Sequence, residues 1–155
     1  MAVCFSFLKE NCMSDNPAAQ LTPEEERRIR EAFEEIPFAR LLGMELGDLR
    51  RGAATLHVEA REELKRNRGI LHGGVVASLA DTAAAFAVLT LAEPGQASTT
   101  IDLTVHYLRP LSAGRATAHA RVVRAGRRVT VISVDVFDEN QALAATALTS
   151  FIRLN

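Results

Sequence analysis

The segment Asn67-Arg68-Gly69-Ile70-Leu71-His72-Gly73-Gly74 leads directly into an alanine-rich apolar segment. Glycines at the mouth of a helix leave backbone N–H groups accessible, and the first N–H groups of a helix have no partners within it. The helix dipole adds positive potential at the same point. These residues therefore predict a helix whose N-terminus stabilises negative charge.

One carboxylate, Asp81, interrupts the apolar segment. Desolvating a lone carboxylate costs on the order of several kcal/mol, so Asp81 must be paired, neutral or chemically active. Two plainer interpretations stay open from the residues alone. Asp81 could pair with an arginine of a neighbouring strand, and His72-Gly73-Gly74 could be only a tight turn.

Length and composition favour a single domain that binds neither nucleic acid nor a membrane. The 155 residues accommodate one core, and a net charge of −1 with interspersed acids and bases argues against a nucleic-acid partner. Cys4 and Cys12 suggest no disulfide framework, so we expect a reducing, cytoplasmic setting. The apolar segment Val75–Ala92 is short for a bilayer and carries Asp81, which indicates a buried helix.

Residues 1–20 are expected to form an N-terminal extension, and residues 21–155 a single domain. The extension lacks the early basic residues and the cleavage site of a secretory signal. Met13 followed by Ser14-Asp15-Asn16 resembles an ordinary protein start. The preceding residues are therefore interpreted either as disordered or as an over-long start assignment.

The sequence predicts two helices and six strands. Thr22-Pro23 and the acids after it begin a helix that we expect to run to about Glu35, to be stopped by Pro37 and to act as a lid or edge cover. A second helix, about Gly74–Leu91, is apolar on nearly all faces and should be wrapped by other structure. The expected strands are Met44–Leu49, Ala53–Glu59, Thr99–Arg109, Arg115–Ala125, Val129–Asp138 and Leu143–Ile152.

The last four strands are separated by turn-rich connections, so we expect consecutive hairpins. Two of these strands have one face rich in small residues, which would let the sheet approach the helix closely. These faces carry Ala116, Ala118 and Ala120, and Ala144, Thr146 and Leu148. One long apolar helix and an antiparallel sheet predict an α+β fold in which the sheet curls around the helix.

With these residues and this layout, the chain resembles the hotdog-fold acyl-CoA thioesterases of the phenylacetate-degradation (PaaI-like), 4-hydroxybenzoyl-CoA thioesterase-like type. The family pattern of Asn, Gly, His-Gly-Gly and Leu-Ala-Asp-Thr-Ala is matched by Asn67, Gly69, His72-Gly73-Gly74 and Leu79-Ala80-Asp81-Thr82-Ala83. A second block, Thr100-Ile101-Asp102-Leu103 with Tyr107 and Pro110, resembles the family's Thr-x-Asp-Leu, aromatic and proline. Gly126-Arg127-Arg128 resembles its hairpin glycine with basic neighbours, and the resemblance covers about Leu41–Ile152.

The resemblance implies a curved antiparallel sheet around one central helix, and hydrolysis of an aromatic or short- to medium-chain acyl-CoA to free acid and CoA. The amide of Gly73 would polarise the carbonyl, because only a residue without a side chain lets a thioester lie against the backbone. Asp81 would act as general base or as nucleophile, and the resemblance does not decide between them. No cofactor is implied, and the scattered histidines show no metal-ligand spacing.

Three further polar residues match the family motif. His72 would orient the loop or bind the substrate carbonyl, Asn67 would orient water or Asp81, and the hydroxyl of Thr100 would help to place the attacking water. Plainer interpretations are a structural histidine, a loop cap and an ordinary strand threonine.

The remaining candidates are expected to bind substrate. Arg109, Arg127 and Arg128 would hold CoA phosphates, although a solvated hairpin explains the last two equally well. Tyr107 would line the acyl pocket, and Gly74 would adjoin the substrate, with a structural role favoured.

The spacing of the two main candidates predicts an oligomer. Gly73 and Asp81 are eight residues apart, which is about 12 Å along a helix. Both must lie within about 3 Å of the reacting atoms, so Asp81 of one protomer should meet Gly73 of its partner across a two-fold axis. The resemblance agrees with an obligatory homodimer and adds that pairs of dimers are common in the family.

An alternative function on the same fold is a non-catalytic module that binds acyl-CoA or regulates a partner. Asp81 argues against it, because a sensor has no obvious use for an acid beside the thioester. A hydratase would need a histidine and a carboxylate at a different spacing, which is not found. An acyl-carrier-protein thioester remains open as the substrate, because its reactive end is the same as that of acyl-CoA.

Overall fold

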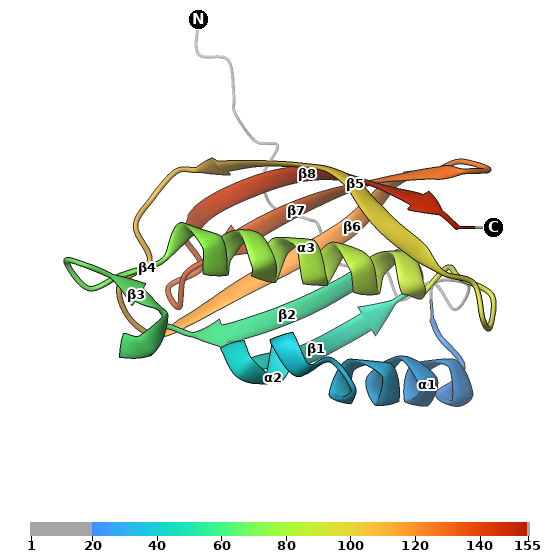
Figure 1. The fold of residues 1–155 in the computed structure, drawn as a ribbon, viewed down its shortest axis with the longest axis horizontal. Helices are drawn as coiled ribbons and strands as arrows, with labels where there is room; N and C mark the ends of the chain where they lie inside the picture. Colours follow the sequence, from blue (N-terminus) through green and yellow to red (C-terminus); the bar gives the residue numbers. More distant parts are fainter. Residues whose placement is uncertain (1–19, 155) are drawn as a thin grey trace, which may run out of the picture.

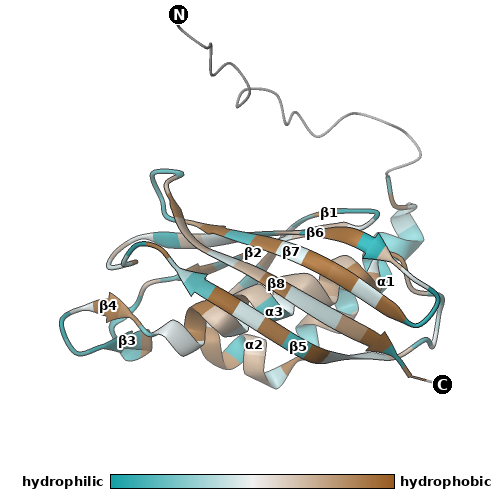
Figure 2. Cartoon of the chain, turned by 90° about the horizontal axis from the view of Figure 1, so that it is seen from above, coloured by the Kyte–Doolittle hydropathy of each residue, from teal (hydrophilic) through white to brown (hydrophobic). Residues whose placement is uncertain are grey.

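The central element of the computed structural model, which describes residues 20–154, is helix α3, Gly73–Leu89. Its alanine-rich sides, including Ala80, Ala83 and Ala84, are fully buried, because small side chains let the sheet approach the helix closely. A six-stranded antiparallel sheet in the order β1-β2-β6-β7-β8-β5 curls around it (Figures 1 and 2). The α+β layout expected from the sequence is confirmed.

The strands of this sheet and of a small separate hairpin begin and end close to the expected residues. Their bounds are β1 Met44–Arg50, β2 Ala53–Glu59, β3 Lys65–Arg66, β4 Ile70–Leu71, β5 Ser98–Tyr107, β6 Arg115–Ala125, β7 Val129–Phe137 and β8 Leu143–Arg153. The hairpin of β3 and β4 was not expected, because each strand has only two residues.

Helix α1, Pro23–Glu34, begins with the expected cap, since the Thr22 side chain accepts from the Glu25 amide and Glu25 accepts from the Thr22 amide. Phe33 docks it on α3, with its ring edge-on to Phe86 at 5.3 Å between centroids. As expected, this helix ends before Pro37, but the short helix that follows was not predicted. Proline is also favoured at the first position of a helix, and Pro37 begins α2, Pro37–Leu42.

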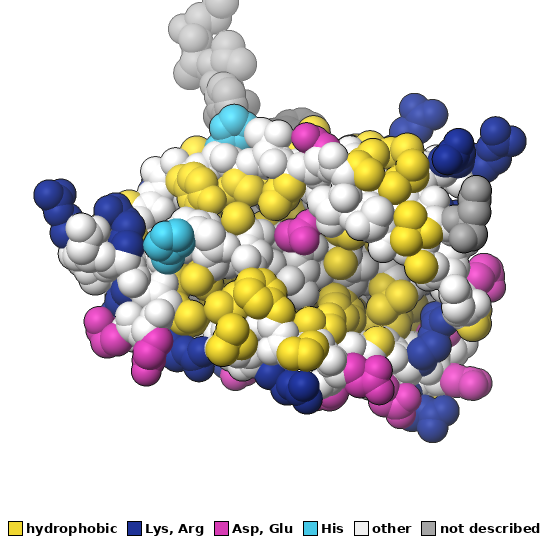
Figure 3. Space-filling view, in the orientation of Figure 1, with side chains coloured by type: hydrophobic (Ala, Val, Ile, Leu, Met, Phe, Trp, Pro, Cys, Tyr) yellow, Lys and Arg dark blue, Asp and Glu magenta, His cyan; other side chains and the backbone are white. Residues whose placement is uncertain are grey.

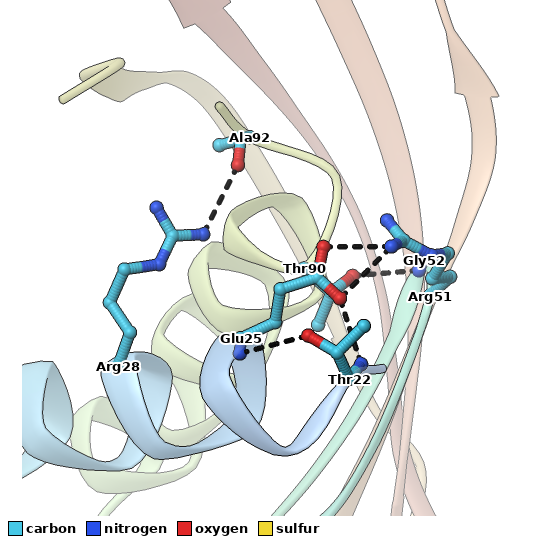
Figure 4. A network of polar contacts seen from close by, with 7 residues as sticks. All are labelled: Thr22, Glu25, Arg28, Arg51, Gly52, Thr90 and Ala92. Atoms are coloured by element: carbon cyan, nitrogen blue, oxygen red, sulfur yellow. Dashed lines mark hydrogen bonds and ion pairs between the residues drawn. The ribbon is translucent and has the colours of Figure 1, made fainter. Parts of the chain in front are cut away.

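The C-terminal end of α3 is tied to the β1–β2 turn and to α1 (Figure 4). The buried hydroxyl of Thr90 donates to the Ala87 carbonyl and accepts from the Gly52 amide, both at 2.7 Å. Nearby, Arg51 forms an ion pair with Glu25 of α1 at 2.7 Å. The residues at the C-terminal end of α3 are therefore engaged in contacts that stabilise the fold.

Strand β5 has a different neighbour from the one expected. It pairs with β8 along the edge of the sheet, and β6 pairs with β2, so β5 and β6 do not form a hairpin. Residues 108–114 cross between them beneath the start of α3, where Leu111 is buried and its carbonyl accepts from the Leu71 amide at 2.6 Å. Local spacing showed the turn, but packing against the helix determined the pairing.

The inward face of β8 also differs from the expectation. Ala116, Ala118 and Ala120 of β6 are buried as predicted. On β8 the inward set is centred on Ala145 and Ala147, whereas Leu148 is 51% exposed on the outer face. A register irregularity between β7 and β8 at Val136–Phe137 accompanies the difference, and a shift of one residue reverses which side chains point inward.

Helix α3 is not wrapped on every side within one chain. A stripe at helical spacing remains partly or fully exposed, and it consists of Gly74, Ala77, Ser78, Asp81, Thr82, Ala85 and Leu89. Helix α3 itself runs between β5 and the side where α1 and α2 lie (Figure 1), and hydrophobic side chains are spread over that face of the molecule (Figure 3). The open face places Asp81 at the surface of the single chain.

The two edge strands of the sheet, β1 and β5, differ in how well their unpaired backbone groups are protected from pairing with another strand. At β1 the guanidinium group of Arg30 donates to the carbonyls of Leu46 and Gly47, and a bulge interrupts the strand. Strand β5 also carries a bulge, between Thr100 and Asp102, but it is a ten-residue edge strand and Ile101 is 55% exposed. An edge of this length and character is suited to pairing with another strand.

The expectations for residues 1–19 lie outside the described part of the chain. Within residues 20–154, none of the helices combines the length and the apolar character needed to cross a membrane.

Candidate active site

The first turn of α3 leaves one backbone donor free. His72 is the N-cap residue, and its Nδ1 accepts from the Gly74 amide at 2.9 Å. The His72 carbonyl accepts from Val75 at 2.9 Å and from Val76 at 3.3 Å. Among the described residues, the Gly73 amide therefore has no hydrogen-bond partner. The His72 side chain orients this turn through Nδ1, and the Gly74 amide is occupied.

Tyr107, at the end of β5, holds the same turn from the side. Its hydroxyl donates to the Gly73 carbonyl at 2.9 Å. A Cβ added to Gly73 would lie 3.3 Å from Tyr107 Cζ, which is tighter than ordinary contact. The tyrosine thus fixes the peptide that follows the free amide and restricts position 73 to glycine or to a residue that displaces the ring.

A cavity of about 440 Å³ opens beside the free amide. Apolar side chains dominate its lining, and two arginines and Tyr107 add polar groups. The lining residues are Arg66, Ile70, Leu71, Gly73, Val76, Tyr107, Leu108, Arg109, Pro110, Leu111, Ala144 and Ala145. Tyr107, which was expected to line the acyl pocket, and Arg109, which was expected to hold CoA phosphates, both line this cavity, whereas sequence reasoning missed Arg66. The basic composition of its hairpin could have indicated it.

Asp81 is anchored by the opposite end of β5. The Thr100 hydroxyl donates to Asp81 Oδ1 at 2.9 Å. Thr82, the next residue along the chain, donates instead to the Ser78 carbonyl one turn back at 2.7 Å. The carboxylate is therefore neither paired with a strand arginine nor buried alone, and it lies half-exposed on the open face of α3.

One chain does not bring the two groups together. Gly73 begins α3, and Asp81 lies eight residues, or about 12 Å, further along the same helix. Asp81 does not line the cavity beside Gly73. Each chain therefore holds the two candidate groups apart, at opposite ends of β5, and we call these two places the candidate half-sites.

The remaining expected residues are dispersed. Asn67 is exposed at the tip of the β3–β4 hairpin, where it does not contact Asp81. Arg127 and Arg128 lie in the β6–β7 turn, at the opposite end of the sheet from Gly73 (Figure 1). Flanking residues of that turn line a crevice with the C-terminal end of α3. Within one chain, neither arginine adjoins the cavity.

Two histidines of the sheet lie apart from this site. His57 Nδ1 and the Thr117 hydroxyl are 3.0 Å apart, and His119 Nδ1 is 3.1 Å from the Thr55 hydroxyl. Desolvation is the main cause that lowers the pKa of both imidazoles. Within the part of the chain that the structure describes, no three His, Cys, Asp or Glu side chains are arranged to hold a metal ion.

Known proteins match both the sequence and the fold. The thioesterase superfamily model matches residues 68–145. The chain is 35% identical over 132 residues to the medium/long-chain acyl-CoA thioesterase YigI of Escherichia coli, covering 76% of this chain and 85% of YigI.

Solved structures also match the fold of this chain. The PaaI protein of the Escherichia coli phenylacetic acid degradation operon superimposes with a TM-score of 0.79 at 26% identity, covering 85% of this chain and 94% of that one. A thioesterase family protein of Silicibacter pomeroyi gives 0.80 at 26%, covering 84% and 98%. The chain therefore belongs to the thioesterase superfamily and is a thioester hydrolase with the hotdog fold of its PaaI-like members.

Proposed function

We propose that the protein hydrolyses the thioester of an aromatic or short- to medium-chain acyl-CoA, and that it does so as a homodimer with two equivalent sites. The observation that carries this proposal is the free Gly73 amide beside a cavity of about 440 Å³. A relative named for acyl-CoA thioesterase activity, at 35% identity, supports the same substrate class.

The free amide stabilises the charge that develops during the reaction. Attack on the thioester carbon moves an electron pair onto the carbonyl oxygen, and the Gly73 N–H donates to that oxygen at the positive end of the α3 dipole. Loss of one such donor costs on the order of 3 kcal/mol in other hydrolases. The Tyr107 hydroxyl keeps the adjoining peptide in place.

Asp81 supplies the second group. As a general base, it takes a proton from water while the water oxygen bonds to the carbonyl carbon, and the C–S bond then breaks to release CoA thiolate, which is protonated to the thiol. As a nucleophile, it forms an acyl anhydride with loss of the thiolate, and water then hydrolyses the anhydride. In both routes the Thr100 hydroxyl orients the carboxylate.

A two-fold axis through the middle of β5 assembles the site. Antiparallel pairing about a two-fold axis at Thr104 places Thr100 of one protomer opposite Tyr107 of its partner, because the bulge at Ile101 takes one residue out of the ladder and leaves each of them three positions from Thr104. Asp81, held by Thr100, then approaches the Gly73 that the partner's Tyr107 holds. The unpaired β5 edge and the open stripe of α3 support this arrangement.

The same pairing bears on Arg127 and Arg128. Because the proposed two-fold axis reverses the strand direction of one sheet relative to the other, the β6–β7 turn of one protomer approaches the cavity end of its partner. These arginines are proposed to meet substrate only across the interface. A pair of dimers is proposed as the complete assembly.

The test is release of CoA thiol, measured with DTNB, over a panel of aromatic and linear acyl-CoAs. We expect turnover by the wild type and at least about a hundredfold loss in Asp81→Asn, which keeps the shape of the side chain and the Thr100 contact. Circular dichroism and gel filtration verify that the variant folds and assembles. Tight binding of acyl-CoA without turnover by the wild type would instead favour the non-catalytic alternative.

A further inference from the structure

We propose that Arg66 and Arg109 form a phosphate-binding rim on the cavity beside Gly73, and that this rim receives the nucleotide end of CoA. The inference rests on the proposed function, because it assigns one end of the substrate to a defined part of that site. Both arginines line the cavity, and they come from segments that are far apart in the sequence.

Neither guanidinium group is engaged elsewhere. Among residues 20–154, Arg66 and Arg109 form no hydrogen bond or ion pair through their side chains. In contrast, Arg115 pairs with Glu45 and Glu59 at 2.7 and 2.9 Å, respectively. No Asp or Glu of the described residues lines the cavity. The two cations are therefore available for an external anion.

Arg66 is presented from an anchored hairpin. Its strand pairs with β4, and the neighbouring Lys65 is bound to Glu62 at 2.6 Å. The His72 amide donates to the Leu64 carbonyl at 2.8 Å, which ties the base of the hairpin to the start of α3. The backbone from which Arg66 projects is thus fixed relative to Gly73.

Arg109 is presented from the opposite wall. The amides of Leu108 and Arg109 both donate to the Ala144 carbonyl, at 2.8 and 3.0 Å, which fixes the segment after β5 against β8. Basic side chains gather at the end of the molecule where Figure 1 places β3 and β4 (Figure 3). The cavity therefore combines an apolar lining, one free amide and a cationic rim.

This combination matches the chemistry of an acyl-CoA. The acyl group and thioester are uncharged, whereas the nucleotide end carries a diphosphate and a 3′-phosphate. Guanidinium groups bind phosphate oxygens through two parallel hydrogen bonds, and such charge-assisted contacts are stronger than neutral ones. The rim would therefore contribute to binding and leave the chemical step unchanged.

The experiment compares two thioesters of one acid, acyl-CoA and acyl-N-acetylcysteamine, which lacks the nucleotide. For Arg66→Ala and Arg109→Ala we expect KM for acyl-CoA to rise about tenfold each, with kcat within about twofold. KM for the N-acetylcysteamine thioester should stay unchanged. Arg27→Ala, at an exposed arginine of α1 outside the cavity, is the matched control.

Three outcomes would overturn the rim. Equal rises in KM for both thioesters would mean that the arginines only shape the wall, and unchanged KM for both would mean that they do not meet substrate. A loss confined to an acyl-carrier-protein thioester would assign them to a protein carrier. Affinity for CoA itself, measured by calorimetry, tests the rim without turnover. Failure of the rim is therefore distinguishable from failure of the proposed hydrolysis.

Discussion

At each end of strand β5 a side-chain hydroxyl donates a hydrogen bond to helix α3, but the groups that accept these bonds have different proposed roles. At one end the Thr100 hydroxyl donates to the Asp81 carboxylate, and at the other the Tyr107 hydroxyl donates to the Gly73 carbonyl, each at 2.9 Å. The Tyr107 end opens onto a cavity, whereas the Thr100 end faces the open side of the helix. A single edge strand thus fixes both half-sites, and neither half is complete alone.

This difference is the reason why we propose that assembly is part of the mechanism. A helix of fixed rise keeps Gly73 and Asp81 about 12 Å apart in every copy of the chain. In the proposed dimer a two-fold axis reverses the direction of β5, so the acid end of one copy would meet the amide end of the other. One contact between two edge strands would then complete two sites.

The largest expected effect is recovery of activity in a mixed dimer. Asp81→Asn and Gly73→Ala should each lower kcat/KM by about 10²–10³-fold, the latter because a methyl group 3.3 Å from the Tyr107 ring obstructs the amide. A heterodimer of the two variants contains one intact site and one doubly altered site. Purified with two different tags, it should regain about half of the wild-type activity per dimer.

Each variant co-expressed with itself under the same two tags is the control and should stay inactive. A heterodimer as inactive as its parents would place both groups in one chain and contradict the two-fold arrangement.

The next largest effect concerns the C-terminal end of α3, where the contacts are structural and no candidate catalytic residue lies. Thr90→Val keeps the shape of a buried residue but leaves the Gly52 amide without its acceptor, so unfolding should become easier by about 2 kcal/mol. Denaturant unfolding measures the loss, and kcat should stay at the wild-type value. Arg51→Ala, which removes the exposed pair with Glu25, should cost less than about 1 kcal/mol.

The sequence predicted the helix, its glycine start and most strand limits, because these depend on local properties. The capped start at Thr22 and the apolar run after Gly74 need only short-range patterns. The half-sites were also predicted as separate, since the helical rise alone keeps Gly73 and Asp81 apart.

Other features depended on long-range packing. The neighbour of β5 is chosen by the way the sheet curls around α3, which no turn signal encodes. Local sequence does not show that Thr100, rather than the adjacent Thr82, donates to Asp81; in the structure the Thr82 hydroxyl is bound to the Ser78 carbonyl. Arg66 lines the cavity because the short hairpin of β3 and β4 folds back over the start of α3, and strands of two residues leave no pattern in the sequence.

The acid end of β5 can be tested by a near-isosteric change. Thr100→Val removes the donor to Asp81 at 2.9 Å, so the carboxylate should lose its fixed orientation and kcat should fall about tenfold with KM nearly unchanged. Steady-state kinetics separates the two constants. Thr100→Ser retains a hydroxyl and should recover most of kcat; an equally impaired serine variant would indicate a packing role instead.

The amide end should respond less. Tyr107→Phe removes the hydrogen bond to the Gly73 carbonyl but keeps the ring that limits position 73, so kcat should fall only about threefold. Because the pocket wall is retained, KM should change little. A larger loss than in Thr100→Val would reverse the ranking of the two ends and show that the amide is the less rigid half.

The smallest effect is expected from His57, which lies outside both half-sites. Desolvation and the nearby charge of Arg115 lower its pKa below the ordinary value of 6.5, against the opposing effect of Glu45. The unfolded chain therefore binds more protons than the native protein just below pH 6.5, so stability should fall as the pH drops through this range. Melting temperatures at pH 7.5 and 5.5 measure the loss, which should be smaller in His57→Gln. Because His57 has no part in either half-site, this variant should keep full activity at pH 7.5, and a large loss of kcat would extend the site beyond the two ends of β5.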